Sequence, residues 1–386
     1  MNILFVNNQY NLFTKADCGA SQRSMCVIHA LAQIGHVDVI SFVDETISNE
    51  SNVDVIYSKE IGMSAHKEGR FGKFLKLFSW KSPYTIFPIN KEKEQIIDAV
   101  VQQGTYDCIY VRYLHFACNC GLLKYADRLF IDYDDDLRDA ARMEADRAKS
   151  FRNKVYGKIY AHTIHYLSCY VAKRIRHAYY SSPNRALPNS DFLPNISAFQ
   201  EPLESVDFAL TKPVILIVGN FKYHPNEYGL LHFLKNIYPS VRKHVVDVEL
   251  HVIGSIPDVM YDRIKPYIQN GVRICGYVSD LVAEYKKCRC VAVPLYQGTG
   301  TSVKLVEAMS LNRAVVSTSV GVRGLHHSFG PTEDYLLEDD DKQFAYAVER
   351  LLLDEKTNRR LSTSALCKIK EHYSAQRFND IIKKTL

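Results

Sequence analysis

A glycine-rich stretch near residue 300 has the residue types that bind a phosphate group. Gln297–Ser302 reads QGTGTS and lies between an apolar run, Cys290–Pro294, and an expected helix, Val303–Leu311. Glycines let a ligand approach the backbone, and Thr301 and Ser302 add hydroxyl donors. The first N–H groups of a helix are unpaired and carry partial positive charge. The stretch therefore predicts an anion site of the kind that holds phosphate.

Two charged residues in the expected helix extend this site. Lys304 stands in the first turn, where the helix field disfavours a cation, so its presence suggests an anionic partner. Glu307 lies three residues further on the same face, where a carboxylate is well placed to accept hydrogen bonds from a ribose diol. An ordinary capped helix with a surface Lys–Glu pair is the alternative interpretation of these residues alone.

Short apolar runs that alternate with helical patterns predict parallel α/β sheets in both halves of the chain. The first half has expected strands at Asn2–Asn7, Val37–Phe42, Cys108–Val111, Leu129–Ile131 and Ala178–Ser181. The second half has them at Pro213–Val218, Val248–Ile253, Val272–Ile274, Cys290–Pro294 and Ala314–Ser317. A Pro- and Asn-rich crossing at 182–195 separates the halves. We expect domains at 1–205 and 206–365, and a C-terminal helix at 366–386 that crosses back to the first domain.

Composition restricts the class of protein. The 386 residues are 47% hydrophobic and 24% charged, which is typical of a globular chain with two domains. A net charge of +5 does not require a nucleic-acid partner. No apolar run has the length of a membrane-spanning helix, and the N-terminus reads as a first strand rather than a signal peptide.

Ten cysteines are scattered along the chain. The pairs Cys118/Cys120 and Cys288/Cys290 lack the spacing of a zinc knuckle, so no metal site is expected. The thiols are interpreted as reduced, in a cytoplasmic protein.

Polar residues follow the expected strands of the first half. Gly19 and Ala20 lie in the first strand-to-helix loop, where doubly wound sheets bind ligands; a flexible surface loop is the alternative. Arg112 and His115 follow the third expected strand. The next strand leads into Asp132–Asp136, whose four carboxylates repel one another and could bind a metal, orient a sugar acceptor, act as a base or cap the next helix. By position we take Arg112, His115 and Asp134 as candidate catalytic residues, with a hydrogen-bonded structural histidine as the competing interpretation.

Two segments combine basic and aromatic residues. The irregular stretch Asp44–Pro88 contains an amphipathic pattern with Lys67, Arg70, Lys73, Lys76, Phe71, Phe74, Leu77, Phe78 and Trp80. Arg138–Arg176 is expected to be one long basic helix. Either segment could touch an anionic membrane at its inner face. Helices packed on the sheet, with solvated lysines, are the competing interpretation.

The second half resembles the retaining GT-B glycosyltransferases, in particular glycosyltransferase family 4. The resemblance rests on the following residues, which occur in the family's order: Val218-Gly219-Asn220, Pro225-Asn226, Val252-Ile253-Gly254, Gly276-Tyr277-Val278-Ser279-Asp280-Leu281, Pro294-Leu295, Gly298-Thr299-Gly300-Thr301, Lys304, Glu307-Ala308-Met309, Val315-Val316-Ser317-Thr318, Gly321 and Gly324-Leu325. The first half matches more loosely, at Gly19-Ala20, Gly35-His36 and Leu193-Pro194-Asn195.

The resemblance implies a GT-B fold, in which the second domain binds a nucleotide sugar, UDP- or GDP-linked, and the first binds a saccharide or lipid-linked acceptor. No further cofactor is implied. Glu307 would hold the ribose, Gly300–Ser302 the diphosphate and Gly276–Val278 the base. The implied donor-binding residues are Gly219, Lys222, Asn226, Gly276, Tyr277, Val278, Gly298, Thr299, Gly300, Thr301, Ser302, Lys304 and Glu307. Gly19 and Ala20 are the implied acceptor-binding residues.

The implied activity is transfer with retention of configuration, in the synthesis of a cell-surface polysaccharide or glycolipid. Two departures from the family stand out. Thr299 occupies a position that is often Glu, and Asn220 one that is often Arg; Lys222 and Lys304 are expected to supply the missing charge. A non-catalytic sugar-nucleotide-binding partner of another transferase and a GT-B nucleotide-sugar epimerase are the alternatives.

Overall fold

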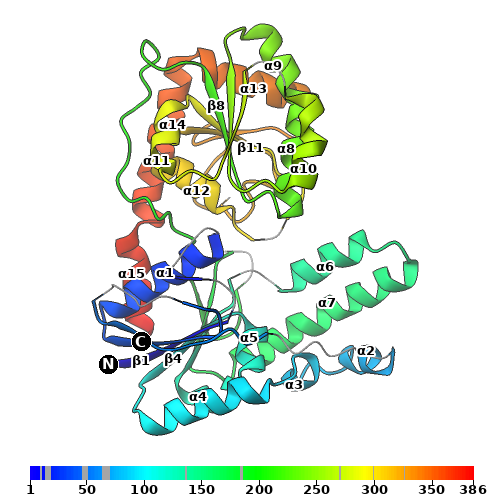
Figure 1. Cartoon of the computed structure of the whole chain (residues 1–386), viewed down its shortest axis with the longest axis vertical. Helices are drawn as coiled ribbons and strands as arrows, with labels where there is room; N and C mark the ends of the chain where they lie inside the picture. The colour runs from blue at the N-terminus through cyan, green and yellow to red at the C-terminus, as the bar shows by residue number, and fades with distance from the viewer. Residues whose placement is uncertain are drawn as a thin grey trace. The chain divides into compact units, whose positions relative to one another are not determined.

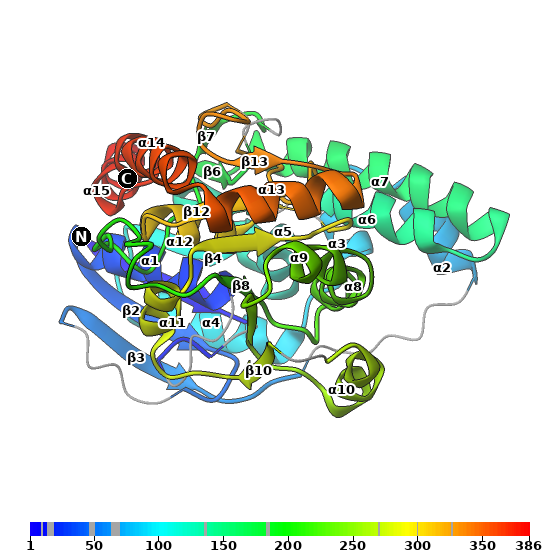
Figure 2. The same ribbon diagram turned by 90° about the horizontal axis from the view of Figure 1, so that it is seen from above.

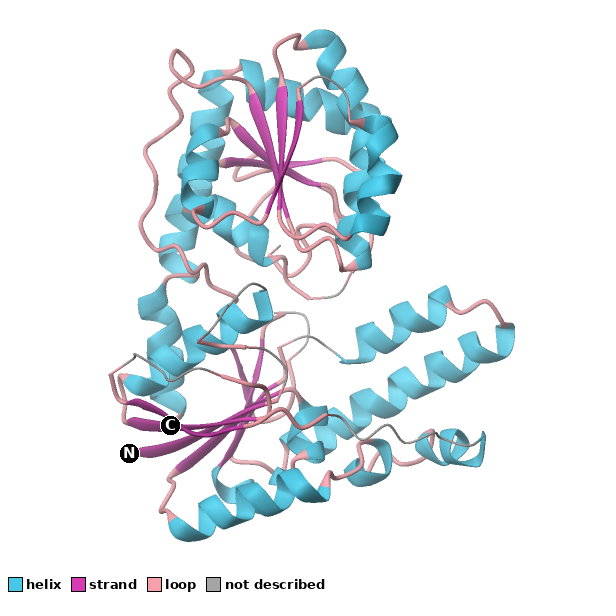
Figure 3. Ribbon diagram, viewed as in Figure 1, coloured by secondary structure: helices cyan, strands magenta, loops and turns pink. Residues whose placement is uncertain are grey.

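The computed structural model describes residues 1–8, 11–13, 19–45, 51–62, 70–134, 137–182, 186–268, 271–298, 300–325 and 327–386, without the side chains of residues 70 and 71. They divide into unit 1, Met1–Pro194 with Phe378–Leu386, and unit 2, Asn195–Arg377. Each unit contains one parallel sheet with helices on both faces (Figures 1 and 3). The predicted pair of doubly wound domains is therefore confirmed.

The sheet of unit 1 has the strand order β3-β2-β1-β4-β5-β6-β7. The strands are β1 Asn2–Asn7, β2 His36–Ser41, β3 Val53–Ser58, β4 Cys108–Arg112, β5 Leu129–Asp132, β6 His177–Tyr180 and β7 Ser190–Phe192. The order reverses between β1 and β4, which makes their carboxyl ends the switch point of the sheet. The edge strands β3 and β7 were missed, because β3 is partly exposed and β7 lies in the expected Pro/Asn-rich crossing.

Helices cover both faces of this sheet. They are α1 Gly19–Ala32, α2 Arg70–Lys76, α3 Pro83–Ile86, α4 Lys91–Gln103, α5 Leu114–Asn119, the 3-10 helix η1 Leu122–Arg128, α6 Leu137–Arg147, α7 Phe151–Ala172 and α15 Ala375–Thr385, whose first three residues belong to unit 2. One face packs a core that includes Ile97 of α4 and Leu167 of α7. At the C-terminus, Phe378 and Ile382 of α15 are fully buried, and Thr385 is hydrogen-bonded to Tyr179 of β6.

The segment expected as one helix over Arg138–Arg176 is two helices, α6 and α7, which lie side by side in Figures 1 and 2. The prediction of a single helix was wrong because Ser150 caps the second one, accepting a hydrogen bond from the Asn153 N–H at 3.2 Å. The two helices pack closely at Gly157, where an added Cβ would lie 2.5 Å from the Cβ of Ala145.

The sheet of unit 2 has the order β10-β9-β8-β11-β12-β13. The strands are β8 Val214–Val218, β9 Glu249–Ile253, β10 Val272–Gly276, β11 Cys290–Val293, β12 Ala314–Ser317 and β13 Leu336–Leu337. The helices are α8 His224–His232, the π-helix η3 Phe233–Ile237, α9 Tyr238–His244, α10 Asp258–Ile264, the 3-10 helix η4 Lys265–Tyr267, α11 Leu281–Lys287, α12 Val303–Ser310, α13 Asp341–Leu353 and α14 Glu355–His372. The order reverses between β8 and β11, so a ligand site is expected beyond their carboxyl ends.

Within the described chain, no helix combines the length and the apolar composition that crossing a bilayer requires.

Candidate functional site

A side-chain hydrogen bond spans the switch point of unit 2. Asn226 lies in the first turn of α8, after β8, and Lys304 lies in the first turn of α12, after β11. The Lys304 ammonium donates to Asn226 Oδ1 at 2.7 Å. The Asn226 amide in turn donates to the Asn220 carbonyl at 2.9 Å, in the loop that follows β8. The two loops that flank the switch point are thus joined through one partly buried cation.

Two glycines leave room for this bridge. A Cβ added at Gly219 would lie 3.2 Å from the Asn226 amide nitrogen and 3.3 Å from Lys304 Nζ. Gly254, after β9, has φ +132° and passes so close to the Gly219 carbonyl that an added Cβ would lie 1.8 Å from its oxygen. The loops after β8 and β9 therefore meet backbone to backbone beside Lys304.

Burial lowers the pKa of the Lys304 ammonium to about 8, although the nearby Glu307 carboxylate acts in the opposite direction. Glu307 is itself buried, with 4% of its surface exposed. A partly desolvated cation that donates to a neutral amide is suited to bind an anion that enters the site. A phosphate oxygen near Lys304 would raise its pKa again.

The loop between β11 and α12 offers further donors. Gly298 and Gly300 have φ of +133° and +73°, which other residues rarely adopt. Ser302 is the N-cap residue of α12 but makes no capping hydrogen bond, and its buried hydroxyl has no partner among the described residues. Thr301 is buried beside it. Thr299, which was also predicted to bind the donor, lies outside the described residues.

Arg323 is a residue of this site that the sequence interpretation missed. Its Nη2 and Nε lie 3.2 Å and 3.4 Å from the Gly300 carbonyl oxygen. The neighbouring Gly324 has φ +85°, and an added Cβ would lie 2.5 Å from Thr301 Oγ1. Arg323 thus brings a second positive charge to the glycine loop. The available signal was a basic residue between Gly321 and Gly324, in the loop that follows the apolar strand β12.

The remaining predicted donor residues lie further from this bridge in the topology. Gly276, Tyr277 and Val278 are at the carboxyl end of β10, the edge strand, and Gly276 accepts a hydrogen bond from the Gly254 N–H at 2.7 Å. Tyr277 is 63% exposed. The Lys222 side chain is also exposed. The structure therefore gathers Lys304 and Asn226 at one point, whereas Lys222 faces solvent.

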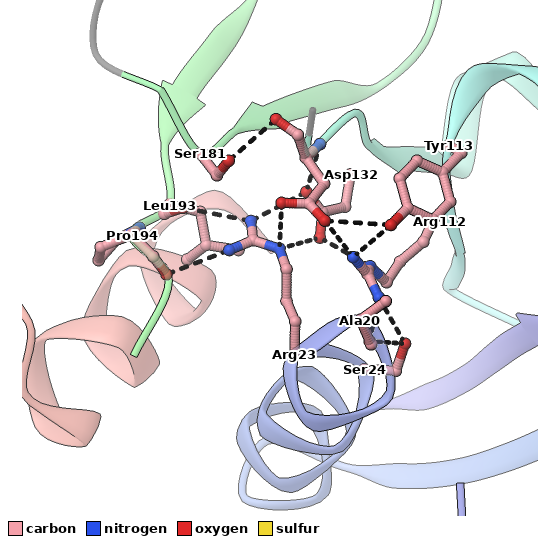
Figure 4. A network of polar contacts seen from close by, with 10 residues as sticks. Ala20, Arg23, Ser24, Arg112, Tyr113, Asp132, Ser181, Leu193 and Pro194 are labelled. Atoms are coloured by element: carbon pink, nitrogen blue, oxygen red, sulfur yellow. Dashed lines mark hydrogen bonds and ion pairs between the residues drawn. The ribbon is translucent and has the colours of Figure 1, made fainter. Parts of the chain in front are cut away.

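Unit 1 contains a buried cluster of charges at its own switch point (Figure 4). Arg23 of α1 makes a two-pronged ion pair with Asp132 of β5, with Nε–Oδ2 at 2.7 Å and Nη2–Oδ1 at 2.9 Å. Arg112 of β4 pairs with Asp134 and donates to Ser24 Oγ at 2.9 Å and to the Ala20 carbonyl. Arg23 also donates to the carbonyls of Pro194 and Leu193, at 3.1 and 3.2 Å.

The cluster balances two guanidinium groups against two carboxylates, all buried. Burial alone would raise the pKa of Asp134, but Arg112 and then Arg23 outweigh it and hold that pKa below its ordinary value. A carboxylate held in this way is a poor proton acceptor, and the repulsion expected within Asp132–Asp136 is relieved for Asp132 and Asp134. Asp135 and Asp136 lie outside the described residues.

This geometry gives Arg112 and Asp134 a positioning role: they fix the start of α1, where the predicted acceptor residues Gly19 and Ala20 lie. Their assignment as catalytic groups stays a prediction. Arg23 was missed, although a cation in an early turn of α1 is the same signal that pointed to Lys304.

His115 lies in the first turn of α5 among aromatic rings. Its ring centroid is 4.1 Å from that of Phe116 and 5.5 Å from that of Tyr113, whose hydroxyl contacts Asp134 at 3.1 Å. Burial lowers the pKa of His115 to about 4, so the imidazole is neutral at pH 7. Its buried Nδ1 has no hydrogen-bond partner within the part of the chain that the structure describes. The ring of Tyr113 thus lies between the predicted catalytic histidine and the charge cluster.

A separate group of potential metal ligands lies at the other end of the strands of the same sheet, where the strands begin. His36, Asp38 and Asp54 belong to the amino-terminal halves of β2 and β3, and their ligand atoms lie within 4.8 Å of one another. His36 Nε2 is 3.1 Å from Asp38 and 3.3 Å from Asp54, so contacts between the imidazole and the two carboxylates account for the grouping.

Comparison with known proteins finds a family model that matches part of unit 2. Residues 212–354 match the model of the family described as "Glycosyl transferases group 1". A protein of Klebsiella pneumoniae, described as an uncharacterized 44.6 kDa protein in the cps region, is 26% identical over 201 residues. That match covers 50% of this chain and 51% of the relative, so it spans about half of the length of each.

Solved structures share the fold over nearly the whole chain. Sucrose-phosphate synthase from Thermosynechococcus elongatus is 15% identical with a TM-score of 0.68, over 99% of this chain and 97% of that one. HepE from Anabaena, in complex with UDP and glucose, is 12% identical with a TM-score of 0.66 over 99% and 98%. WaaG, a glycosyltransferase involved in lipopolysaccharide biosynthesis, is 13% identical with a TM-score of 0.65 over 98% and 99%.

Proposed function

We propose that this chain, whose residues 212–354 match the group 1 glycosyltransferase model and whose fold is GT-B, transfers a sugar from a nucleotide sugar to a saccharide or lipid-linked acceptor. The observation that carries the proposal is the Lys304–Asn226 bridge at the switch point of unit 2. It places a partly buried cation close to the unpaired Ser302 hydroxyl and to the glycine loop, and a diphosphate would need both a cation and hydrogen-bond donors.

The donor would bind along the carboxyl edge of the unit 2 sheet. Lys304, Ser302 and the backbone N–H groups at the start of α12 would hold the diphosphate. Glu307, one turn along the helix, would accept hydrogen bonds from the ribose hydroxyls. Gly276–Val278 would lie against the base. Bound UDP in HepE, which has the same fold, supports UDP as the first nucleotide to test.

We propose transfer with retention of configuration. The bond between the anomeric carbon and the leaving phosphate oxygen breaks, and the acceptor oxygen bonds to the same face of that carbon. The acceptor proton passes to a leaving phosphate oxygen. Lys304 and the helix N–H groups would stabilise the negative charge that develops on the diphosphate, so no protein base is required. This fits the low proton affinity of Asp134.

The proposed acceptor rests on the relatives and on the residues at the start of α1. The cps-region relative and the lipopolysaccharide enzyme WaaG support a surface polysaccharide or glycolipid product. We propose that Gly19 and Ala20, held by Arg112, contribute to the acceptor side. The chain would then work in the cytoplasm, with unit 1 in reach of the inner membrane face when the acceptor is lipid-linked.

A thermal-shift panel of UDP-, GDP-, ADP- and dTDP-sugars tests the donor site, because a ligand that binds the native state raises its melting temperature. We expect one nucleotide family to stabilise the protein, and Glu307→Gln to lose that shift. Glu355→Gln, an exposed carboxylate on α14, is the matched control and should keep it. No shift with any of the four would count against the donor site.

Product analysis separates the rivals. Release of free nucleotide together with a sugar-extended acceptor supports a transferase. Binding without turnover, across a panel of saccharide and lipid-linked acceptors, would favour a non-catalytic binding partner. A nucleotide sugar epimerised or hydrolysed without an acceptor would favour the epimerase. The non-catalytic binding partner stays an alternative because Thr299 departs from the family motif.

A further inference from the structure

Unit 1 exposes large apolar side chains on one surface. We call this the aromatic–basic face and define it by the exposed residues Phe74, Phe78, Trp80, Phe151, Val155, Ile159 and Tyr166, together with the exposed lysines Lys73, Lys81, Lys154 and Lys158. Phe151 is 82% exposed and Phe78 68%. Single exposed apolar residues are common, but a connected group of aromatic ones marks an interaction site.

The apolar residues of α7 form a stripe along one side of the helix. Phe151, Val155 and Ile159 follow one another at four-residue spacing, so they share a face. Gly157, on the opposite side of the helix, packs against Ala145 of α6. The stripe therefore points away from α6.

The segment that follows α2 continues this stripe. Thr163 of α7 donates its hydroxyl to the Leu77 carbonyl at 2.6 Å. The Trp80 ring lies 6.3 Å from that of Tyr166 and 6.4 Å from that of Tyr170. Figure 1 shows this segment and α6 on opposite sides of α7. Phe74, Phe78 and Trp80 thus belong to the same surface as the stripe on α7.

The two sequence stretches that form this surface carry only positive charges. There is no Asp or Glu between Arg70 and Lys91, or between Lys149 and Arg176. Lys154 and Lys158 flank the apolar stripe on α7, and Lys73 and Lys81 flank Phe74, Phe78 and Trp80. Lys158 lies 3.9 Å from Asp146 of α6, with both groups exposed. Exposed aromatic rings ringed by cations match the interface of an anionic bilayer.

We propose that the aromatic–basic face docks unit 1 on a membrane rich in anionic lipid. The aromatic rings enter the headgroup region, and the lysines pair with lipid phosphates. A second copy of the chain fits this surface less well, because it would bring two sets of lysines together. If the proposed glycosyl transfer holds, docking would present unit 1 to an acceptor carried by that lipid; the docking itself does not depend on the transfer.

The protein contains its own probe for this proposal. Trp80 is the only tryptophan in the sequence and lies on the aromatic–basic face. The full chain is mixed with phosphatidylcholine vesicles, with and without phosphatidylglycerol. We expect a blue shift of Trp80 emission and quenching by brominated lipid only with the anionic vesicles. The shift should weaken as salt is added, because lipid and lysine charges are screened.

Variants on and off the face locate the contact. Phe78→Ser with Phe151→Ser should weaken sedimentation with anionic vesicles by about tenfold or more, because two inserting rings are lost. Lys154→Glu with Lys158→Glu should also weaken this sedimentation, most strongly at low salt. The matched controls lie in unit 2: Leu210→Ser with Val246→Ser, which are 85% and 80% exposed, and Lys235→Glu with Lys243→Glu. Both control pairs should bind as the natural chain does.

Three results would overturn the proposal. The first is no sedimentation with anionic vesicles at low salt. The second is an equal loss of binding in the unit 2 controls. The third is a lipid-free dimer that Phe78→Ser with Phe151→Ser dissociates, which would make the face a contact between copies. None of these measurements uses a nucleotide sugar, so a failed transfer assay leaves the docking result unchanged.

Discussion

Lys304 and Asn226 are 78 positions apart in the sequence, yet their side chains meet in a 2.7 Å hydrogen bond. The contact exists because β8 and β11 are neighbours in the sheet and each sends its following helix from the same edge. In unit 1, Arg112 makes an equivalent connection, from the end of β4 to Ala20 and Ser24 of α1. In both units, therefore, a long basic side chain connects the two loops or helices that follow the strands at the switch point.

The first prediction concerns the charge of Lys304. Because its pKa is about 8, the free site loses its cation as the pH rises through that value. Donor affinity should be level from pH 6.5 to 7.5 and then fall by up to about tenfold per pH unit above 8. Lys304→Met should weaken binding about tenfold to a hundredfold at pH 7 and abolish the pH dependence. Isothermal titration of the nucleotide sugar measures both. Lys235→Met, an exposed position on η3, is the control. A pH profile that survives Lys304→Met would exclude Lys304 as its source.

Arg323 provides a second test of the donor site. Arg323→Ala removes a positive charge and the hydrogen bonds to Gly300, so donor affinity should fall about tenfold. Arg323→Lys keeps the charge without the fork and should be intermediate. Arg359→Ala, on the exposed side of α14, should leave affinity unchanged. Equal donor affinity in all three variants would mean that Arg323 only holds the glycine loop and does not contribute to donor binding.

Gly254 and Gly276 form a matched pair of positive-φ glycines. An alanine at Gly276 has no atom within 4 Å of its Cβ, so Gly276→Ala should cost only the backbone strain, about 1–2 kcal/mol. Gly254→Ala puts its Cβ 1.8 Å from the Gly219 oxygen and should cost a further 1–3 kcal/mol or so through forced movement of the β8 loop. Chemical denaturation followed by circular dichroism compares them. Equal losses would show that the loop after β8 yields freely.

The ion cluster of unit 1 predicts a compensation experiment. Arg23→Met leaves Asp132 buried without its two-pronged partner and should destabilise unit 1 by about 3–5 kcal/mol. Adding Asp132→Asn restores the balance of charge and should recover part of that loss. Trp80 fluorescence during urea unfolding reports on unit 1, since it is the only tryptophan. Arg176→Met, an exposed substitution, is the control. A strictly additive double variant would contradict the pairing.

His115 should make stability depend on acidity. Its pKa is about 4 in the folded chain and near 6.5 when unfolded, so between these values the unfolded state binds the extra proton. Stability contributed by the neutral ring is present above pH 6.5 and is lost as the pH falls toward 4. From pH 7 to 5 the loss should approach about 2 kcal/mol. His115→Asn should flatten this slope, followed through Trp80, whereas exposed His162→Asn should not.

The sequence predicts what is local and misses what depends on topology. Buried strands such as β1 and β8 are nearly unbroken apolar runs, so their positions followed directly. The edge strands β3 and β7 bury one side only or are very short, and their patterns resemble loops. The break between α6 and α7 depends on a single capping serine, Ser150.

The same division holds for the sites. Lys304 and Glu307 were predictable because their chemistry lies within one helix next to its glycine loop. Arg23 and Asp132 are 109 positions apart, and only the strand order brings them together. Arg323 acts on a loop that precedes it by a full strand and helix, so its role depends on the fold as well.

The return of Phe378–Leu386 to unit 1 has a consequence for synthesis on the ribosome. Phe378 and Ile382, which are buried, and Thr385, which contacts Tyr179, leave the exit tunnel after all of unit 2. Translation proceeds over seconds, so unit 2 has time to fold first while the sheet face beneath α15 waits for its cover. Unit 1, whose first residues are made before unit 2, is therefore completed only after unit 2, and a chain that stops before Phe378 would lack part of the unit 1 core.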